Sequence, residues 1–471
     1  MKRSPAALLC AAAVAWLATS AVALAAPTPT PRPTPTVTVT PPPPPPYMQP
    51  HTPSPTPSAS PTLLTLSQAE EIALATSPQL ALARATVEQE QAGVGIARSG
   101  ALPDINGMAQ TTRASSHINV QTQQGGTVSE QFLTTQNSAN VTLNQLILDG
   151  GRVFAEVQAA RYSTDSAKLT LLRDIQTVLL TVAQDYYAAL QARHQLQASQ
   201  QSLAVAQVQE KLVEAQYHAG VASRADVLTA QLPVAQAELA VASAQNGEAE
   251  NVASLLDEMG LEATVPVTLQ DDTSISASNP DVNQALSEAL AERTDLSAAK
   301  ASLSSSQADV RAAKLAWFPV IGGTATSGTG TTGQSGANYA ANWSLGASLS
   351  FPIYTGGLIG SQVQQAQALE AQSAANYETA RLNVYLTVRQ AYLGLLTAAS
   401  SLSAAKAALD QARVVLDVTN AQYKAGVTTL PLLLNAQSQL TTAQSNWVQA
   451  LYSYKVAQQN LLYSEGTLGP S

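Results

Sequence analysis

Residues that could do chemistry are scarce in this chain, and none of their spacings matches a catalytic or metal site. The histidines are His51, His117, His194 and His218, and none stands at metal-ligand spacing from another histidine or from the single cysteine, Cys10. The sequence has no Walker phosphate loop, no serine nucleophile elbow and no dinucleotide fingerprint. We therefore predict that the protein is not an enzyme and holds no metal or other cofactor.

Two short glycine-centred segments stand out instead, one in each half of the chain. They are AQYHAGV (Ala215–Val221) and AQYKAGV (Ala421–Val427). A glycine at this place permits a left-handed turn between two antiparallel helices. Small apolar residues left exposed at such a turn are typical of a partner-binding surface. The candidate docking residues are Tyr217, Ala219, Gly220, Val221, Tyr423, Ala425, Gly426 and Val427.

The two segments belong to an internal duplication. A shift of 216 positions places Leu66–Pro103 on Val282–Pro319, and a shift of 206 places Asp149–Gly260 on Thr355–Gly466, both without a gap. A period of roughly 210 residues is too long for a solenoid repeat. The pattern therefore predicts one domain plan built twice.

The chain divides into five segments by composition. They are a signal peptide (1–25), a proline-rich linker (26–62), a first repeat (63–265), a second repeat (266–466) and a short tail (467–471). Lys2 and Arg3 precede an apolar stretch and small residues, as in secretory signals. The linker is either a disordered spacer or a tether that reaches the cell-wall layer. The net charge of −9 disfavours nucleic acid as a partner.

Helices dominate both repeats. Ser67–Glu70 has capping-box spacing, and the helical region that it opens is interrupted near Ser77–Pro78 and ends before Pro103. After the junction glycines of each repeat, about 70 residues carry apolar side chains every seven positions, which predicts a long supercoiled helix. A second helix then returns from the tip glycine. The junction glycines are Gly150, Gly151, Gly356 and Gly357.

Between these helices each repeat has two predicted strands. Trp343–Ile353 alternates apolar and small polar residues, and Ala139–Ile147 does so more weakly. Further strands are predicted near Asp104–Arg113 and Val320–Gly328. Four strands cannot close a barrel, and an open sheet edge is not tolerated in lipid. Two chains would give a barrel too narrow for a solute channel, so we expect three chains and twelve strands.

With these features the chain resembles the TolC family of outer-membrane export ducts from about Leu63 to Gly466. The resemblance implies an α+β membrane protein with four strands and long coiled-coil helices per chain. It implies a homotrimer with a 12-stranded β-barrel in outer-membrane lipid and an α-helical periplasmic tunnel. The function implied is a passive exit duct of a tripartite efflux pump or type I secretion system. Its helical tips would dock on a periplasmic adaptor (membrane fusion protein) of an inner-membrane transporter. The alternative is a non-conducting periplasmic coiled-coil spacer, which would leave the alternating strands unexplained.

The resemblance also implies a tunnel gate close to the tips. Asp226 stands where the family places an acidic gate residue, although Ser223–Asp226 also has capping-box spacing. In the second repeat Leu432 and Asn435 occupy positions that are acidic in the family pattern, and Thr428 stands where a basic residue is expected. This departure predicts a weakly charged, partly apolar constriction.

Overall fold

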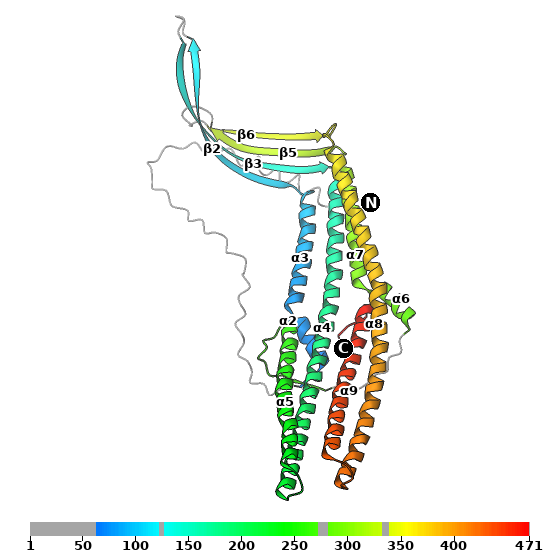
Figure 1. The fold of residues 1–471 in the computed structure, drawn as a ribbon. Coiled ribbons are helices and arrows are strands. Elements are labelled where there is room, and N and C mark those ends of the chain that lie inside the picture. Colours follow the sequence, from blue (N-terminus) through cyan, green and yellow to red (C-terminus); the bar gives the residue numbers. More distant parts are fainter. Residues whose placement is uncertain (1–62, 122–126, 272–280, 332–338, 471) are drawn as a thin grey trace. The chain divides into compact units, whose positions relative to one another are not determined.

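The computed structural model describes residues 63–121, 127–271, 281–331 and 339–470 (Figure 1). All the described residues belong to one compact unit within 60–471. The predicted signal peptide and linker, with Cys10 and His51, lie outside the described residues.

The two repeats build the same elements in the same order, as the duplication predicts. The first consists of α2 (Leu66–Thr76), α3 (Pro78–Ser99), β2 (Asp104–Gln121), β3 (Thr127–Leu148), α4 (Arg152–His218) and α5 (Arg224–Glu258). The second consists of α6 (Val282–Glu292), α7 (Thr294–Leu315), β5 (Val320–Thr331), β6 (Tyr339–Ser350), α8 (Leu358–Lys424) and α9 (Leu430–Glu465). Two very short strands that the sequence did not predict, β1 (Leu63–Leu64) and β4 (Thr268–Leu269), pair in parallel.

The four long strands form one antiparallel sheet in the order β2-β3-β5-β6. The pairing of β3 with β5 runs from Asn137 opposite Thr331 to Leu148 opposite Ile321, and it joins the two repeats. β2 and β3 are longer than predicted: β2 continues beyond Arg113 to Gln121, and β3 begins at Thr127, before Ala139. The apolar face of β6 is uncovered in the single chain, where the side chain of Trp343 is 81% exposed.

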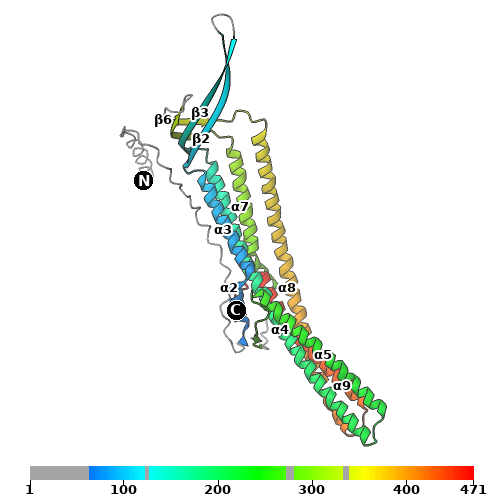
Figure 2. The ribbon, with the colours of Figure 1, turned by 90° about the vertical axis from the view of Figure 1, so that its left-hand side faces the viewer.

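The long helices form two hairpins, α4 with α5 and α8 with α9 (Figures 1 and 2). α4 and α8 have 67 residues each, which corresponds to about 100 Å at 1.5 Å per residue. In the predicted row of apolar residues at every seventh position of α8, Val388, Leu395, Leu402 and Leu409 are buried, whereas Leu416 and Tyr423 are partly exposed. Among the residues described, none of the helices combines the length and the apolar character that crossing a membrane requires.

The largest hydrophobic core lies where α2, α4, α5 and α9 meet the β1–β4 pair. Tyr186 of α4 is almost fully buried there, and its hydroxyl lies 3.0 Å from the Leu64 carbonyl oxygen and 2.7 Å from that of Gln270. The core therefore fixes the segment that enters the first repeat and the segment that leaves it.

The predicted start of the first helix is wrong by two residues. The capping residue is Thr65, whose hydroxyl accepts the Gln68 N–H, while the Gln68 side chain accepts the Thr65 N–H. Glu70, which the predicted capping box places in the first turn as the partner of Ser67, is buried. Both Thr65–Gln68 and Ser67–Glu70 have the required spacing, and the sequence pattern alone did not separate them.

Candidate functional site at the helical tips

Each long hairpin turns through a glycine in the left-handed conformation, as predicted. φ is +79° at Gly220 and +71° at Gly426. In the first tip the Gly220 N–H donates to the Tyr217 carbonyl at 2.9 Å, and the Val221 N–H donates to the Gln216 carbonyl at 2.9 Å. The second tip repeats both bonds at 3.0 and 2.9 Å. This is a Schellman motif, which satisfies carbonyls that the end of a helix leaves free.

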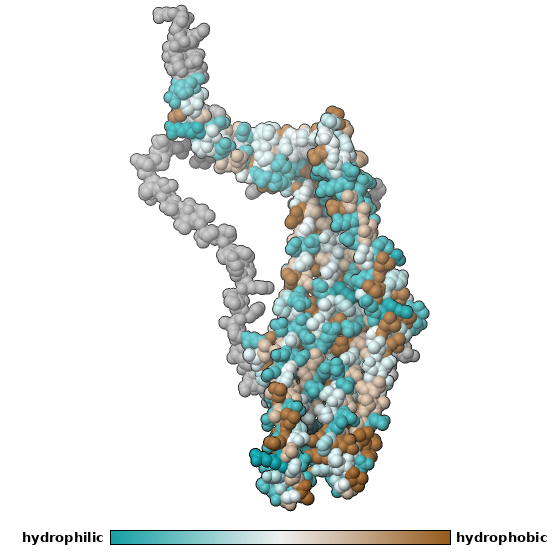
Figure 3. Space-filling model, in the orientation of Figure 1, coloured by the Kyte–Doolittle hydropathy of each residue, from teal (hydrophilic) through white to brown (hydrophobic). Residues whose placement is uncertain are grey.

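The predicted docking residues are open to solvent at both tips. Val221 is 80% and Val427 is 77% exposed, and Ala219 and Ala425 beside the glycines are exposed as well. The aromatic residues lie further back, and Tyr423 is only partly exposed. Figure 3 shows hydrophobic surface near the lower ends of the long helices. The structure thus brings the eight residues together as two separate surfaces, one on each hairpin.

Asp226 caps the helix that leaves the first tip. Its carboxylate accepts the Ser223 N–H and the Ser223 hydroxyl, both at 2.8 Å, and the Ser223 hydroxyl accepts the Asp226 N–H at 3.2 Å. Hydrogen bonds from the Ser223 backbone and side chain lower the pKa of Asp226. The capping role is confirmed, and the gate role of this exposed carboxylate stays a prediction.

The second tip lacks this acidic cap. Thr429 precedes α9 without a side-chain capping bond, and Pro431 follows in the first turn, where a missing N–H is harmless. Leu432 stands at the position of Asp226 and is 52% exposed. Asn435 lies one turn further along, and its side-chain oxygen accepts the Gln439 amide at 3.0 Å. The predicted gate positions of the second repeat, including the partly exposed Thr428, therefore present no charge.

At the first strand-to-helix junction, Gly150 and Gly151 have φ of +71° and +91°. Asp149 just before them caps α4: its carboxylate oxygens accept the Gly151 N–H at 2.9 Å and the Val153 N–H at 2.7 Å. A Cβ placed on Gly150 would lie 2.6 Å from Cβ of Phe318, which precedes β5. Glycine is required here both by the backbone conformation and by this close packing.

The second junction has the same backbone but not the same surroundings. Gly356 and Gly357 have φ of +61° and +86°. Thr355 replaces the capping aspartate, and its hydroxyl is buried without a hydrogen-bond partner. A Cβ on Gly356 would meet no atom of this chain within 4 Å. This junction is therefore uncovered in the single chain.

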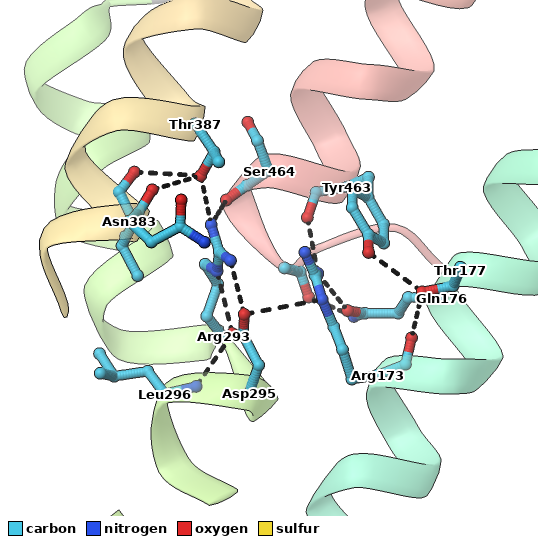
Figure 4. Close-up of polar contacts among 12 residues, drawn as sticks. Arg173, Gln176, Thr177, Arg293, Asp295, Leu296, Asn383, Thr387, Tyr463 and Ser464 are labelled. Carbon is cyan, nitrogen blue, oxygen red and sulfur yellow. Dashed lines mark hydrogen bonds and ion pairs between the residues drawn. The ribbon is translucent and has the colours of Figure 1, made fainter. Parts of the chain in front are cut away.

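Sequence reasoning missed a buried charged network that joins the repeats (Figure 4). Arg293, at the start of α7 and 3% exposed, donates to both carboxylate oxygens of Asp295 at 3.0 and 2.6 Å and to the Thr387 hydroxyl at 2.7 Å. Arg173 of α4 lies 3.9 Å from the same carboxylate, and its guanidinium stacks 3.6 Å from the Tyr463 ring centre. The network links α4 to α7, α8 and α9.

Burial and the neighbouring charges have opposite effects on the pKa values of Asp295 and Arg173. Burial raises the pKa of Asp295, but the hydrogen bonds and charge of Arg293, together with the charge of Arg173, outweigh it, so the pKa is lowered. Burial also lowers the pKa of Arg173, although Tyr463 and Asp295 counteract this. The sequence signal for the network was that the two repeats differ at both arginines: Arg173 corresponds to Thr379, and Arg293 corresponds to Ser77.

No group of three or more histidine, cysteine, aspartate or glutamate side chains that could hold a metal occurs within the described ranges. His194 makes a close polar contact: its Nε2 lies 2.8 Å from a carboxylate oxygen of Asp271. Its ring stacks on Tyr452, which donates to the same carboxylate at 3.0 Å. This cluster fixes the segment after β4.

A family model described as outer membrane efflux protein matches residues 71–261 and 285–467, one stretch in each repeat. Outer membrane protein TolC of Escherichia coli (strain K12) is 34% identical over 152 residues, which are 31% of this chain and 31% of that protein. The match therefore spans about a third of the length of that relative. Outer membrane efflux protein BepC of Brucella suis biovar 1 is 26% identical over 379 residues, 80% of this chain and 79% of that protein.

Solved structures share the fold. The CmeC outer membrane channel of Campylobacter jejuni gives a TM-score of 0.75 at 17% identity and covers 85% of each chain. The MtrE outer membrane channel of Neisseria gonorrhoeae, solved in its open state, gives 0.70 at 20% identity and covers 85% of this chain and 88% of that one. At these identities the likeness concerns the fold alone.

Proposed function

This chain belongs to the outer membrane efflux protein family, and on that premise we propose that three copies form a passive exit duct. It is located in the outer membrane and extends into the periplasm, in agreement with the names of its relatives. Substrate would be delivered by an inner-membrane transporter and a periplasmic adaptor, in an efflux pump or a type I secretion system. Transport energy would come from the transporter, since the sequence offers no catalytic site.

The observation that carries the proposal is that the second repeat lacks the partners that the first repeat finds within the chain. α4 packs on α7 and α9 of the second repeat, whereas α8 packs on α6, α7 and α9 of its own repeat. The missing partners of α8 are α3 and α5, which a neighbouring copy would supply. The pairing of β3 with β5 would likewise be repeated between β6 and the β2 of that neighbour.

The strand-to-helix junctions support the same closure. Phe318 covers Gly150, and its counterpart in the first repeat is Leu102, which is 60% exposed. The counterpart of Gly150 is Gly356, which nothing covers. In a ring of copies, Leu102 of one copy would lie on Gly356 of the next.

The long helices carry matching apolar stripes on their outer sides. Leu228 and Leu232 of α5 point away from α4 and are exposed, as are Val414 and Val418 of α8 on the side away from α9. Leu228 and Val418 both lie eight residues from their tip glycines, and Leu232 and Val414 both lie twelve. The stripes therefore reach the same heights and would meet across the boundary between copies.

The number three follows from barrel width. Four strands leave two edges open, which lipid does not tolerate, and eight strands leave an interior that side chains fill. Twelve strands, from three copies, give a wider interior. The exposed apolar face of β6 also disfavours the alternative of a purely periplasmic coiled-coil spacer, in which this face would remain in water.

We place the adaptor contact at the two tip surfaces around Gly220 and Gly426. Their exposed valines and alanines are small enough for another helical hairpin to approach closely. The tunnel entrance would lie beside them and be lined by Asp226, Leu432 and Asn435. Because two of these three side chains are uncharged, the entrance would be weakly charged and partly apolar.

A disulfide cross-link tests the assembly. In the double variant Leu232→Cys, Val414→Cys, mild oxidation of the detergent-extracted protein should link neighbouring copies into covalent trimers on a non-reducing gel. The matched control is Leu232→Cys, Val208→Cys, because Val208 is the first-repeat counterpart of Val414 and is equally open in the single chain. Val208 lies on α4, which in the proposed ring does not face the α5 of a neighbouring copy, so the control should stay monomeric.

Cross-linked trimers that insert into planar bilayers as discrete conducting units would support the duct. Cross-linking in both variants would indicate random collision. Monomeric protein that needs no detergent and never conducts would contradict the proposal and favour the spacer.

A further inference from the structure

A cavity of about 570 Å³ lies in the helical wall between α3, α4 and α7. This volume is within the range of small-molecule sites. The three helices run beside one another, with α4 in the middle (Figure 1). Eight of the fifteen residues that line the cavity are serine or threonine, and the lining also includes Glu90 and Asp174 but no lysine, arginine or histidine. None of the motifs assigned to assembly or docking includes these residues.

Three of the lining hydroxyls donate their protons to backbone carbonyls. Ser166 donates to the Ala298 carbonyl at 3.0 Å, and Ser305 donates to the Ala159 carbonyl at 2.9 Å. Thr170 donates to the Ser166 carbonyl at 3.0 Å. A hydroxyl group has one proton and two lone pairs, so these side chains can offer the cavity only acceptor atoms.

The carboxylates add acceptors and negative charge. Glu90 uses one oxygen to accept the Ser163 hydroxyl at 2.7 Å. Asp174 makes no hydrogen bond or ion pair with any other described residue. Burial raises its pKa, as expected for a carboxylate without a compensating charge. Gln79 is the one lining side chain with N–H donors. The lining therefore suits a positively charged occupant that is rich in hydrogen-bond donors.

The carboxylates mark the two ends of an elongated space. Ser163, which holds Glu90, and Asp174 are eleven residues apart on α4, which corresponds to about 16 Å along the helix axis. Hydroxyl acceptors from α4 and α7 lie between them. An occupant that reaches both ends must be long and must carry donors along its length.

At the corresponding positions of α8, the second repeat has different residues from those that line the cavity. There Tyr377 replaces Leu171 and Ala380 replaces Asp174. The tyrosine packs against the hydrophobic cluster of α6, α7 and α8. A bulky aromatic side chain and an uncharged one thus stand where the first repeat has open space and a carboxylate.

We propose that the cavity between α3, α4 and α7 binds an elongated aliphatic polyamine. Its terminal ammonium groups would pair with Glu90 and Asp174, and its inner N–H groups would donate to the serine and threonine oxygens. This site does not depend on the duct function, because all its residues belong to one chain. Occupation would tie α3, α4 and α7 together and hold Asp174 ionised.

Isothermal titration of the full-length, detergent-extracted protein with spermine tests the proposal. We expect saturable binding of one spermine per chain, and binding of the short diamine putrescine weaker by about tenfold, because it cannot reach both carboxylates. Asp174→Asn removes one charge with little change in shape and should weaken spermine binding about tenfold. Leu171→Tyr, which introduces the residue of the second repeat, should weaken it at least as much.

The matched control is Asp165→Asn. Asp165 is also on α4, but its exposed carboxylate pairs with Lys168 and does not line the cavity. Its removal should leave spermine binding within about twofold of the wild type. An equal loss in Asp165→Asn and Asp174→Asn would show diffuse attraction to an acidic protein and overturn the proposal. So would the absence of saturable binding, or equal affinity for spermine and putrescine. Circular dichroism of each variant confirms folding, and Asp174→Asn retains the test if Leu171→Tyr does not fold.

Discussion

Replacing Gly150 by alanine should destabilise the first strand-to-helix junction for two separate reasons. Its φ of +71° lies in the left-handed region, where an L-residue loses about 1–2 kcal/mol. The new Cβ would also lie 2.6 Å from Cβ and 2.8 Å from Cγ of Phe318, whereas carbon atoms in contact lie about 3.5–4.0 Å apart. Moving Phe318 by about 1 Å is an overpacking change that costs about 1–3 kcal/mol. The expected total is about 2–5 kcal/mol.

The matching substitution Gly356→Ala tests whether copies assemble into the proposed ring. In an isolated chain the substitution should destabilise the fold only through the left-handed backbone, by about 1–2 kcal/mol, because no atom lies within 4 Å of the new Cβ. In a ring of copies, Leu102 of the neighbour adds the packing term, and the loss should approach that of Gly150→Ala. The control is Gly360→Ala, because Gly360 lies in helix α8 with ordinary φ and open space, and alanine should be neutral or stabilising by up to about 1 kcal/mol.

The assay is the thermal midpoint of the detergent-extracted oligomer, followed by far-ultraviolet circular dichroism and by trimer bands on semi-native gels. Midpoints lowered similarly by Gly150→Ala and Gly356→Ala, with Gly360→Ala unchanged or higher, would agree with both the contact and the ring. If Gly150→Ala behaves like Gly360→Ala, the packing argument is refuted. If Gly356→Ala loses clearly less than Gly150→Ala, the second junction is uncovered in the assembly and the proposed closure is wrong.

Three further predictions concern other parts of the chain. Hydrogen bonds from Ser223 lower the pKa of Asp226. The capping box therefore stabilises α5 fully at pH values above 3.8, the ordinary pKa of the group, and this stability is lost as the pH falls through the lower pKa of the folded protein. Amide protection factors in the first turn of α5 should therefore fall in acid, and Asp226→Ala should show the lower protection already at neutral pH. Arg293→Met leaves Asp295 without its main partner and should lower stability by about 2–4 kcal/mol in thermal unfolding, while adding Asp295→Leu should recover most of the loss. Leu432→Asp should raise cation over anion permeability in planar bilayers, and an unchanged ratio would place Leu432 away from the conducting path.

Much of the tip and junction geometry could be predicted because it is local. Gly220 and Gly426 need a left-handed backbone for the chain to reverse, and the Ser223–Asp226 box lies within four residues. Competing local patterns set the limit, as at Thr65: Thr65–Gln68 and Ser67–Glu70 both have capping-box spacing, and the structure forms the first. The extensions of β2 beyond Arg113 and of β3 before Ala139 were not predicted.

The sequence by itself determined the two-fold plan of the protein: the order of its elements, the length of its helices and the places where glycine reverses the chain. These features depend on residues close together in sequence, and the duplication states each of them twice. Only the tertiary structure decided how the two repeats meet. The pairing of β3 with β5, the contact of Phe318 with Gly150, and the Arg173–Asp295–Arg293 network all join residues of different repeats. A duplication specifies what each half builds, whereas the packing between halves depends on residues that differ between them, such as Arg173 and Arg293.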